Sequence, residues 1–543
     1  MNKQNYFTYK NRILLIGIIA IISVAMAALM INLKKGYYID EYYTYTLANG
    51  THLGIDIADG AWNDTTPFTD ELIISEDTRF SFAQACANTA DDVHPPLYYI
   101  CVNAVSSLFA GRFSNWFAMT VNVISLIVCA YFTCAILLEI SDGKWPFAIV
   151  AMAAYMLNPA VISNLAYFRM YFMLSAIAMA YAYVHIRMLK AEKITLKHLI
   201  GVYLLGVAGF MTHYYMLFVM FFGAFFFAAF NFFFRKKYLQ TIEYAAAVVA
   251  VIVTEYLIWP ICIAHMFIGY RGQGAREGLL DFASIPGKIM EFTGFINDKV
   301  FSGTLLILLV LIVAAYVVKS ENRNLDYKIS SDKSDKFGKY YIFYYPLLTA
   351  LGYFLAVALT ALDSNRFLFP MEGILLIYVI YGLLNGAERL CNIFLSNDSR
   401  KNSERRKWIP ILSTAVIYIC AVFLPAMIKG NIDYLYPERG RVTEALESKH
   451  SDAAITFQGD FYDNNIDEFI MFDRVYFAGA DIDDGKVITD ISDVVNSQDE
   501  TYIFIENVRD QDKIKDMLLK NFEGRELCYV GNSNGAYDVF VLR

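Results

Sequence analysis

The chain has 543 residues, of which 57% are hydrophobic, 16% aromatic and only 18% charged. A soluble protein of this length carries more charge, and apolar runs near the roughly 20 residues that span a bilayer recur through most of the sequence. These features exclude a soluble protein and predict a multi-pass membrane protein. The net charge of −8 says little, because the charges are segregated along the chain.

The first apolar run covers residues 13–33 and is too long for the core of a signal peptide, which predicts a retained helix. Later connecting segments are rich in Lys and Arg, as cytoplasmic loops are. These segments lie at 187–197, 235–237, 319–339 and 389–407. Lys3, Lys10 and Arg12 place the N-terminus on the same, cytoplasmic side.

Counting crossings between the basic segments predicts about eleven spanning helices. Residues 199–234 must cross twice, with a turn near Thr212–Tyr215. Four apolar runs lie between the first helix and Arg187, but only three crossings bring Arg187 to the cytoplasmic side. The shortest run, 95–110, is therefore predicted to be an interfacial or re-entrant helix. The remaining crossings are predicted at 241–263, 302–318, 341–361, 367–386 and 408–428.

Two soluble parts are predicted outside the cytoplasm. The first loop, 32–114, is polar, with helical stretches around 69–90. Residues 429–543 alternate between strand-like and helix-like runs and end in a hairpin that turns at Ser533–Gly535, which predicts a small, acidic α/β domain. The strands are expected at AAITFQ, RVYFAG, TYIFIENV and ELCYV, and the helices at NIDEFIMF and QDKIKDMLLKNF. The predicted domains are thus a transmembrane domain, 1–428, and a capping or acceptor-facing domain, 429–543.

The crossing count places most polar motifs at one face, the extracytoplasmic one. Ionisable groups at a membrane edge are functional candidates. The motifs are Asp40 with Glu41, Asp91–His94, Arg169–Tyr171, Thr212–Tyr215 and Asn365 with Arg366.

The order of these motifs resembles the polytopic GT-C glycosyltransferases, in particular the protein O-mannosyltransferase and aminoarabinose-transferase branch. The segments that carry the likeness are DEYYTY, DDVHPPLYY, YFRMYFML, THYY and SNRFLFP. It covers residues 10–390 and leaves out the C-terminal part. The resemblance implies a mainly α, GT-C-like fold with outer juxtamembrane helices. It also implies inverting sugar transfer, in the plasma membrane, from a polyprenyl-phosphate-linked donor to a hydroxyl of a protein, lipid or cell-envelope glycan.

Asp40 and Glu41 are the candidate catalytic residues. Transfer to a hydroxyl needs a base that accepts the hydroxyl proton, and an ionised carboxylate can do this. Adjacent carboxylates repel, which raises one pKa. The resemblance favours an acidic residue here as the base over a solvated helix cap. It leaves open whether Asp40 or Glu41 is the base.

Four arginines are candidates for binding the donor phosphate, because a forked guanidinium matches phosphate and stabilises the leaving group's charge. Arg169 and Arg366 begin helices that enter the membrane, with simple snorkelling as the alternative. Arg271 and Arg276 lie in the glycine-rich segment YRGQGAREG, which is predicted to be a mobile loop that closes over the donor or only a flexible surface loop.

The remaining substrate-binding candidates are Asp92, His94, Tyr98, Tyr171 and His213. His94 lies just before two prolines, which can start a helix, and serves either the substrate or a capping turn. One imidazole and two carboxylates within four residues are a weak signal for a divalent metal, so no metal ligand is assigned and a metal cofactor stays open. Most of the tyrosines fit an aromatic belt at the membrane surface.

Two other classes of protein compete with the glycosyltransferase. A transporter or flippase of a lipid-linked or anionic solute needs polar residues at mid-membrane, often in paired repeats, whereas these lie at one face. A polytopic scaffold whose acidic tail binds a partner leaves the polar cluster unexplained. No feature indicates nucleic-acid binding.

Overall fold

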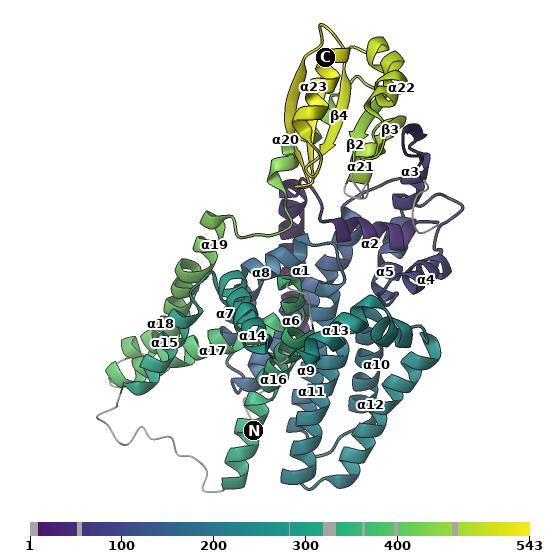
Figure 1. Cartoon of the computed structure of the whole chain (residues 1–543). Coiled ribbons are helices and arrows are strands. Elements are labelled where there is room, and N and C mark those ends of the chain that lie inside the picture. The colour runs from purple at the N-terminus through teal and green to yellow at the C-terminus, as the bar shows by residue number, and fades with distance from the viewer. Residues whose placement is uncertain are drawn as a thin grey trace.

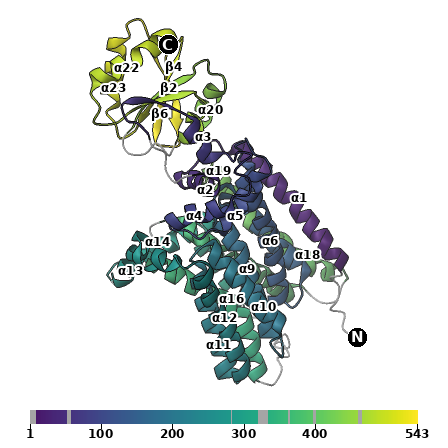
Figure 2. The same cartoon turned by 90° about the vertical axis from the view of Figure 1, so that its right-hand side faces the viewer.

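The computed structural model describes residues 9–51, 57–281, 283–318, 333–360, 364–395, 400–458 and 465–543. Its largest part is a bundle of apolar helices with the C-terminal sheet domain at one end (Figures 1 and 2). The bundle consists of α1 (Tyr9–Leu33), α6 (Trp116–Ile140), α7 (Trp145–Met156), α8 (Pro159–Ala166), α9 (Tyr171–Lys190), α10 (Leu196–Thr212), α11 (Met216–Ala229), η1 (Phe230–Phe234), α12 (Tyr238–Ile258), α15 (Leu305–Val317), α16 (Lys333–Thr360), α17 (Phe369–Phe394), α18 (Arg400–Tyr418), η6 (Ile419–Phe423) and α19 (Leu424–Lys429).

Among the described residues, eight helices are long and apolar enough to cross a membrane, or ten if each of two bent pairs is one span. The bent pairs are α7 with α8, at 52°, and the α14–η3 segment with α15, at 83°. The apolar helix α10 has 17 residues and is not among these spans, so the predicted number of about eleven is reached only if α10 also crosses. The return helix predicted at 302–318 is thus short and sharply bent from its predecessor. The turn predicted near Thr212–Tyr215 is confirmed, because α10 ends at Thr212 and α11 begins at Met216.

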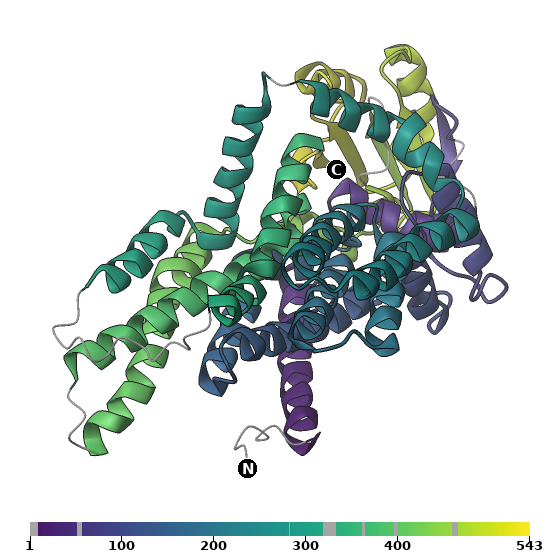
Figure 3. The same cartoon turned by 90° about the horizontal axis from the view of Figure 1, so that it is seen from below.

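The centre of the bundle is formed by α6 and α9, which pack against each other, with α7 and α17 beside them. In Figure 1, α15 and α18 lie on one flank and α10 and α12 on the other. Figure 3, seen from the end opposite the soluble domain, shows these teal and green helices in front of the yellow-green sheet. The central helices are the most buried of the spans. In α9 and in the α17 region, 78% of the residues in the most apolar stretch are buried inside the structure.

Short helices cover the end of the bundle that faces the soluble domain. They are α2 (Ile39–Asn49), α3 (Thr66–Leu72), α4 (Phe82–Asp91), α5 (Leu97–Ser107), η2 (Ala264–Ile268), α13 (Tyr270–Leu280), α14 (Ile285–Phe295), η3 (Ile296–Val300) and η5 (Asn365–Leu368). Helix α5 has 11 residues and is about 16 Å long, too short for a hydrocarbon core of about 30 Å. The prediction of a non-spanning helix at 95–110 therefore fits. The glycine-rich segment expected to be a mobile loop is instead helix α13.

The soluble region is a six-stranded mixed sheet with strand order β1-β3-β2-β4-β6-β5. Its elements are β1 (Ala61–Asp64), η7 (Pro437–Arg439), α20 (Gly440–Glu447), β2 (Ala453–Phe457), α21 (Ile466–Phe469), β3 (Arg474–Ala478), α22 (Asp484–Ser497), β4 (Thr501–Glu506), α23 (Gln511–Asn521), β5 (Leu527–Ser533) and β6 (Tyr537–Leu542). All four predicted strands and the closing hairpin are confirmed. The helix expected at NIDEFIMF is only the four residues of α21.

The edge strand β1 comes from the first loop rather than from the C-terminal part of the chain. It pairs antiparallel with β3, and Ala61 lies opposite Phe477. The C-terminal domain predicted at 429–543 leaves out this strand, which the first loop supplies. We still propose two domains, and the first loop passes from one to the other.

Candidate functional site

Asp40 lies in the first turn of α2, immediately after the chain leaves α1. An acidic residue is favourable there, because the amide groups at a helix N-terminus carry partial positive charge. Its side chain is 19% exposed. The carboxylate Oδ2 pairs with Arg366 Nη1 and accepts a hydrogen bond from the Tyr167 hydroxyl at 3.2 Å. Arg169 Nη1 donates to the backbone oxygen of Asp40 at 2.9 Å, so two arginines from distant parts of the chain meet at this residue.

The two arginines are positioned by breaks between helices. Arg169 lies in the turn that joins α8 to α9, and Arg366 lies in η5, just before α17. Arg169 is only 2% exposed. In both side chains the buried Nε has no hydrogen-bond partner among the described residues. A buried donor without a partner is costly, so both guanidinium groups have capacity for a further acceptor.

These charges set the protonation state of Asp40. Burial raises the pKa of its carboxyl group, but Arg169 and Arg366 outweigh burial and hold that pKa below its usual value. Asp40 is therefore ionised at neutral pH. The hydrogen bonds found among the described residues engage its Oδ2 and leave Oδ1 available to accept a proton.

His94 and Asp92 extend the cluster on the side of Arg169. His94 Nδ1 lies 2.6 Å from Asp92 Oδ2, and its Nε2 lies 3.5 Å from Arg169 Nη2. Because a guanidinium only donates, Nε2 is the acceptor and the proton sits on Nδ1. Burial, together with Arg169, lowers the pKa of His94 although Asp92 opposes this. His94 is therefore a neutral hydrogen-bonding group at neutral pH.

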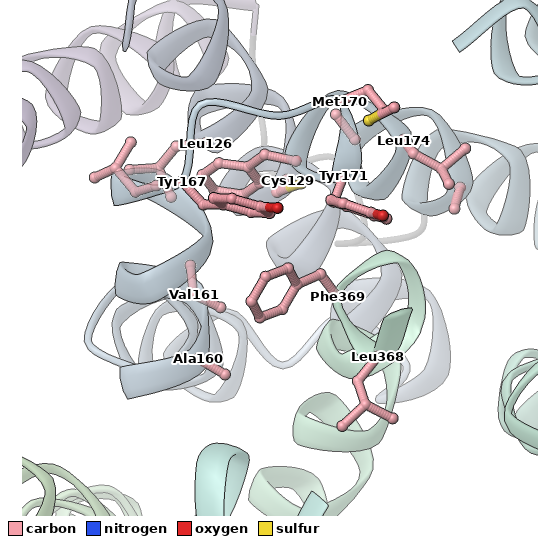
Figure 4. Close-up of a cluster of buried hydrophobic side chains, with 14 of the residues drawn as sticks. Leu126, Cys129, Ala160, Val161, Tyr167, Met170, Tyr171, Leu174, Leu368 and Phe369 are labelled. Atoms are coloured by element: carbon pink, nitrogen blue, oxygen red, sulfur yellow. The ribbon is translucent and has the colours of Figure 1, made fainter. Parts of the chain in front are cut away.

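Aromatic rings line the same cluster. Tyr167 stacks on Tyr434 with ring centroids 4.0 Å apart and on Tyr171 at 6.0 Å. Figure 4 shows Tyr167 and Tyr171 above Phe369, in the apolar layer between α8 and the start of α17. The His213 ring lies 5.3 Å from Tyr171 and 5.9 Å from His94. This arrangement provides a polar centre bordered by closely packed aromatic rings.

Glu41 points away from this centre and is completely buried. It accepts hydrogen bonds from the backbone N–H groups of Tyr38 at 2.7 Å and Phe168 at 2.9 Å, and it pairs with Lys34 at 2.9 Å. Burial raises the pKa of Glu41 and lowers that of Lys34, while each charge opposes the change in the other. The contacts make Glu41 an anchor for α2 and leave Asp40 as the carboxylate that faces the arginines.

Replacing Glu41 by Gln is expected to destabilise the protein by about 3–5 kcal/mol, because it leaves the buried Lys34 ammonium uncompensated. The thermal unfolding midpoint in detergent measures this loss. A double variant, Lys34→Met with Glu41→Gln, removes both charges and is expected to recover most of it. A single variant as stable as the native protein would contradict the anchoring role.

The remaining candidates from the sequence are Tyr98, Arg271 and Arg276. Tyr98 is buried beside Tyr99, whose ring, rather than that of Tyr98, faces Arg169 at 5.8 Å. Arg276 is exposed on α13, and the side chain of Arg271 lies outside the described residues. Within the described residues, no group of three or more His, Cys, Asp or Glu side chains is placed to hold a metal ion.

Three residues of the cluster do not follow from the sequence reasoning. Tyr167 lies two positions before Arg169, inside the segment YFRMYFML, and this proximity was a usable signal. Tyr434 follows the last spanning helix and carries no local signal. Asp433, next to it, joins Asn365 at 2.8 Å and Lys299 at 2.7 Å, which ties this linker to η5.

The bundle of apolar helices with a polar centre at one end defines a polytopic membrane protein. Its fold is GT-C-like, as the similarity to a solved structure shows. The chain is similar to the crystal structure of ArnT from Cupriavidus metallidurans bound to undecaprenyl phosphate, with a TM-score of 0.50 and 10% identity over 96% of this chain and 97% of that chain. ArnT is a GT-C aminoarabinose transferase. A crystal structure of the same protein in the apo state gives a TM-score of 0.42 at 11% identity, over the same shares of the two chains.

At this level of identity the similarity to ArnT shows the fold. The resemblance expected from the five motifs is confirmed to that extent, and it covers the C-terminal part as well, which the motifs did not. No family model and no curated protein matches the sequence.

Proposed function

We propose that this chain is a membrane glycosyltransferase that moves a sugar from a polyprenyl-phosphate-linked donor to a hydroxyl of a protein, lipid or cell-envelope glycan. The observation that carries the proposal is the ionised Asp40 held between the buried Arg169 and the half-buried Arg366, at one end of an apolar bundle. The undecaprenyl phosphate named for the ArnT structure supports the donor class.

The donor phosphate is proposed to bind at the arginines. Each guanidinium has an Nε that lacks an acceptor among the described residues, and phosphate oxygens supply one. As the bond between the anomeric carbon and the phosphate oxygen breaks, the electron pair stays on the phosphate. Fixed cations stabilise this growing charge more than they stabilise the intact donor.

Asp40 is proposed to be the base. The acceptor hydroxyl attacks the anomeric carbon on the side opposite the phosphate, which inverts that carbon, and its proton passes to Asp40. Tyr167 and Tyr171, which are buried and stacked on other rings, are proposed to shape the wall of the sugar site beside Asp40. His94, oriented by Asp92, is proposed to contact the donor or acceptor through the nitrogen that faces Arg169.

The site is proposed to face the extracytoplasmic side of the plasma membrane, with the N-terminus in the cytoplasm. The basic segments 187–197 and 235–237 support this, because they mark cytoplasmic loops. The soluble domain, at the same end as Asp40, then lies outside the cytoplasm.

Vesicles containing the purified protein and polyprenyl-phosphate sugars test the function. A glycosyltransferase releases polyprenyl phosphate when acceptor is added, whereas a flippase moves the intact lipid between leaflets without cleaving it. The proposal is supported if polyprenyl phosphate is released only when acceptor is present and the intact lipid does not move between leaflets. Lipid movement without cleavage would replace it by the transporter alternative.

The pH dependence of transfer is expected to differ between the free and the donor-bound protein. In the free protein the arginines lower the pKa of Asp40, so kcat/KM should decline only below the usual aspartate value of about 3.9. Bound phosphate shares the arginine charges and adds negative charge, which raises the pKa of Asp40, so the acidic decline of kcat should lie at higher pH. Initial rates from pH 3.5 to 8, with unfolding midpoints at each pH, should show the acidic decline of kcat within this range while kcat/KM stays nearly level. Coincident limbs would contradict a shared site for phosphate and Asp40.

A further inference from the structure

The segment that connects α1 to α2 is enclosed by the C-terminal part of the chain. Lys34 Nζ donates to the Tyr434 backbone oxygen at 2.7 Å, and the Lys35 backbone N–H donates to the Leu435 oxygen at 2.7 Å. Gly36 lies so close that a Cβ there would be 2.3 Å from Asn534 Oδ1. A larger residue at Gly36 fits only if the Asn534 side chain and Tyr436, whose Cβ would lie 2.8 Å away, move.

Tyr42, two residues beyond Asp40, makes the most specific tie to the soluble domain. It is completely buried. Its hydroxyl donates to the Asp467 carboxylate and accepts a hydrogen bond from Asn534 Nδ2 at 3.1 Å. Asp467 is fixed in turn by Arg439, whose Nη2 lies 2.8 Å from Asp467 Oδ2 and whose Nε lies 2.8 Å from Glu468 Oε1.

The soluble domain also holds the chain beyond α2. Strand β1 completes the edge of the sheet against β3. Trp62 Nε1 donates to the Asp490 backbone oxygen at 3.0 Å, and Thr65 Oγ1 donates to the Phe472 oxygen at 2.5 Å. The C-terminal part of the chain therefore contacts the first loop on both sides of α2, through residues 34–37 before it and 61–65 after it.

We infer that the C-terminal domain positions Asp40, and that Tyr42 is the positioning residue through which it does so. The inference rests on the proposed function for Asp40. The two arginines belong to the bundle. Helix α2 packs on α3, α4 and α5 and donates from Thr44 to the Phe168 oxygen, and Tyr42 adds a tie from α2 to the soluble domain. Both sets of contacts must agree for Asp40 to meet Arg366 and an acceptor hydroxyl, and misplacement by about 1 Å can cost 10²-fold in rate.

Two matched substitutions test the inference in the full chain. Tyr42→Phe removes a hydroxyl that contacts Asp467, and Tyr476→Phe removes a hydroxyl that contacts Asp490 at 3.0 Å within the sheet domain. Tyr42→Phe is expected to lower kcat about 10-fold with little change in the KM for donor, and to move the acidic limb of kcat/KM to higher pH. Tyr476→Phe is expected to leave both unchanged. Equal effects of the two variants on rate and pH limb would overturn the inference.

A readout that does not need catalysis separates this inference from the proposed function. Hydrogen–deuterium exchange of the α2 amides, residues 39–49, is expected to be faster in Tyr42→Phe than in Tyr476→Phe. If the native protein transfers no sugar, the proposed function fails, while faster exchange still supports the attachment of α2 to the domain. If transfer occurs and Tyr42→Phe matches the native protein in rate, pH limb and exchange, the positioning role alone fails.

Discussion

Replacing Asp40 by Asn is expected to lower kcat for sugar transfer by about 10²–10⁴-fold, the range that a positioned general base contributes. Asparagine keeps the shape of the side chain but cannot accept the hydroxyl proton. Removing the negative charge also frees Arg366 from its ion pair. Donor affinity should therefore stay the same or increase, and the loss should appear in kcat. Release of polyprenyl phosphate measures the rate, and titration with the donor measures affinity.

Asp70→Asn is the matched control for this prediction. Asp70 lies on α3 in the same first loop, and its side chain is exposed. The same change of Asp to Asn there should affect neither rate nor affinity. Full activity of Asp40→Asn in vesicles would refute the assignment of the base. Normal kcat with weakened donor binding would instead make Asp40 a binding residue.

The sequence predicted the common location of the polar motifs because topology constrains it. Basic loops fix which end of each helix faces the cytoplasm, so motifs at the opposite ends must share one surface. Asp40, Arg169 and Arg366 meet there although more than 300 residues separate the first from the last. Topology alone does not give contacts, but it reduces the candidates to one end of the bundle.

The sequence could not decide between Asp40 and Glu41. Consecutive residues on a helix point about 100° apart, so one of them faces the arginines and the other faces the backbone of Phe168 and Lys34. Which one does so depends on how α2 is rotated, and this rotation depends on packing against α4 and α5 and on contacts with residues 434–439 and 467–468. The contacts with the C-terminal part join segments about 400 residues apart, and no local sequence pattern indicates them.

In helix α13 a local sequence pattern is present but gives the wrong prediction. Its glycines predicted a loop, since glycine destabilises helices by roughly 1 kcal/mol relative to alanine. Gly278 nevertheless lies where a Cβ would be 2.7 Å from the Leu359 backbone oxygen, so at this position glycine permits close packing of α13 against α16. Tertiary packing overrides the local preference here.

Replacing Arg366 by Ala is expected to weaken binding of a polyprenyl-phosphate sugar about 10–100-fold, the equivalent of one charge-assisted hydrogen bond of about 1.5–3 kcal/mol. The guanidinium is held by Asp40 and by the Tyr167 hydroxyl at 3.1 Å, so it is oriented before the donor arrives. Alanine removes both the charge and the unpartnered Nε. Arg112→Ala, at an exposed position of the first loop, is the matched control and should bind donor normally.

A double variant separates direct contact from an indirect effect. Arg366→Ala leaves Asp40 without its main counter-ion, and this bare carboxylate would itself repel a phosphate. If Arg366 contacts the donor directly, adding Asp40→Asn removes the repulsion but restores only part of the affinity, because the lost hydrogen bonds are not replaced. Full recovery of donor affinity in the double variant would mean that Arg366 serves only to neutralise Asp40, and the phosphate site would then have to rest on Arg169.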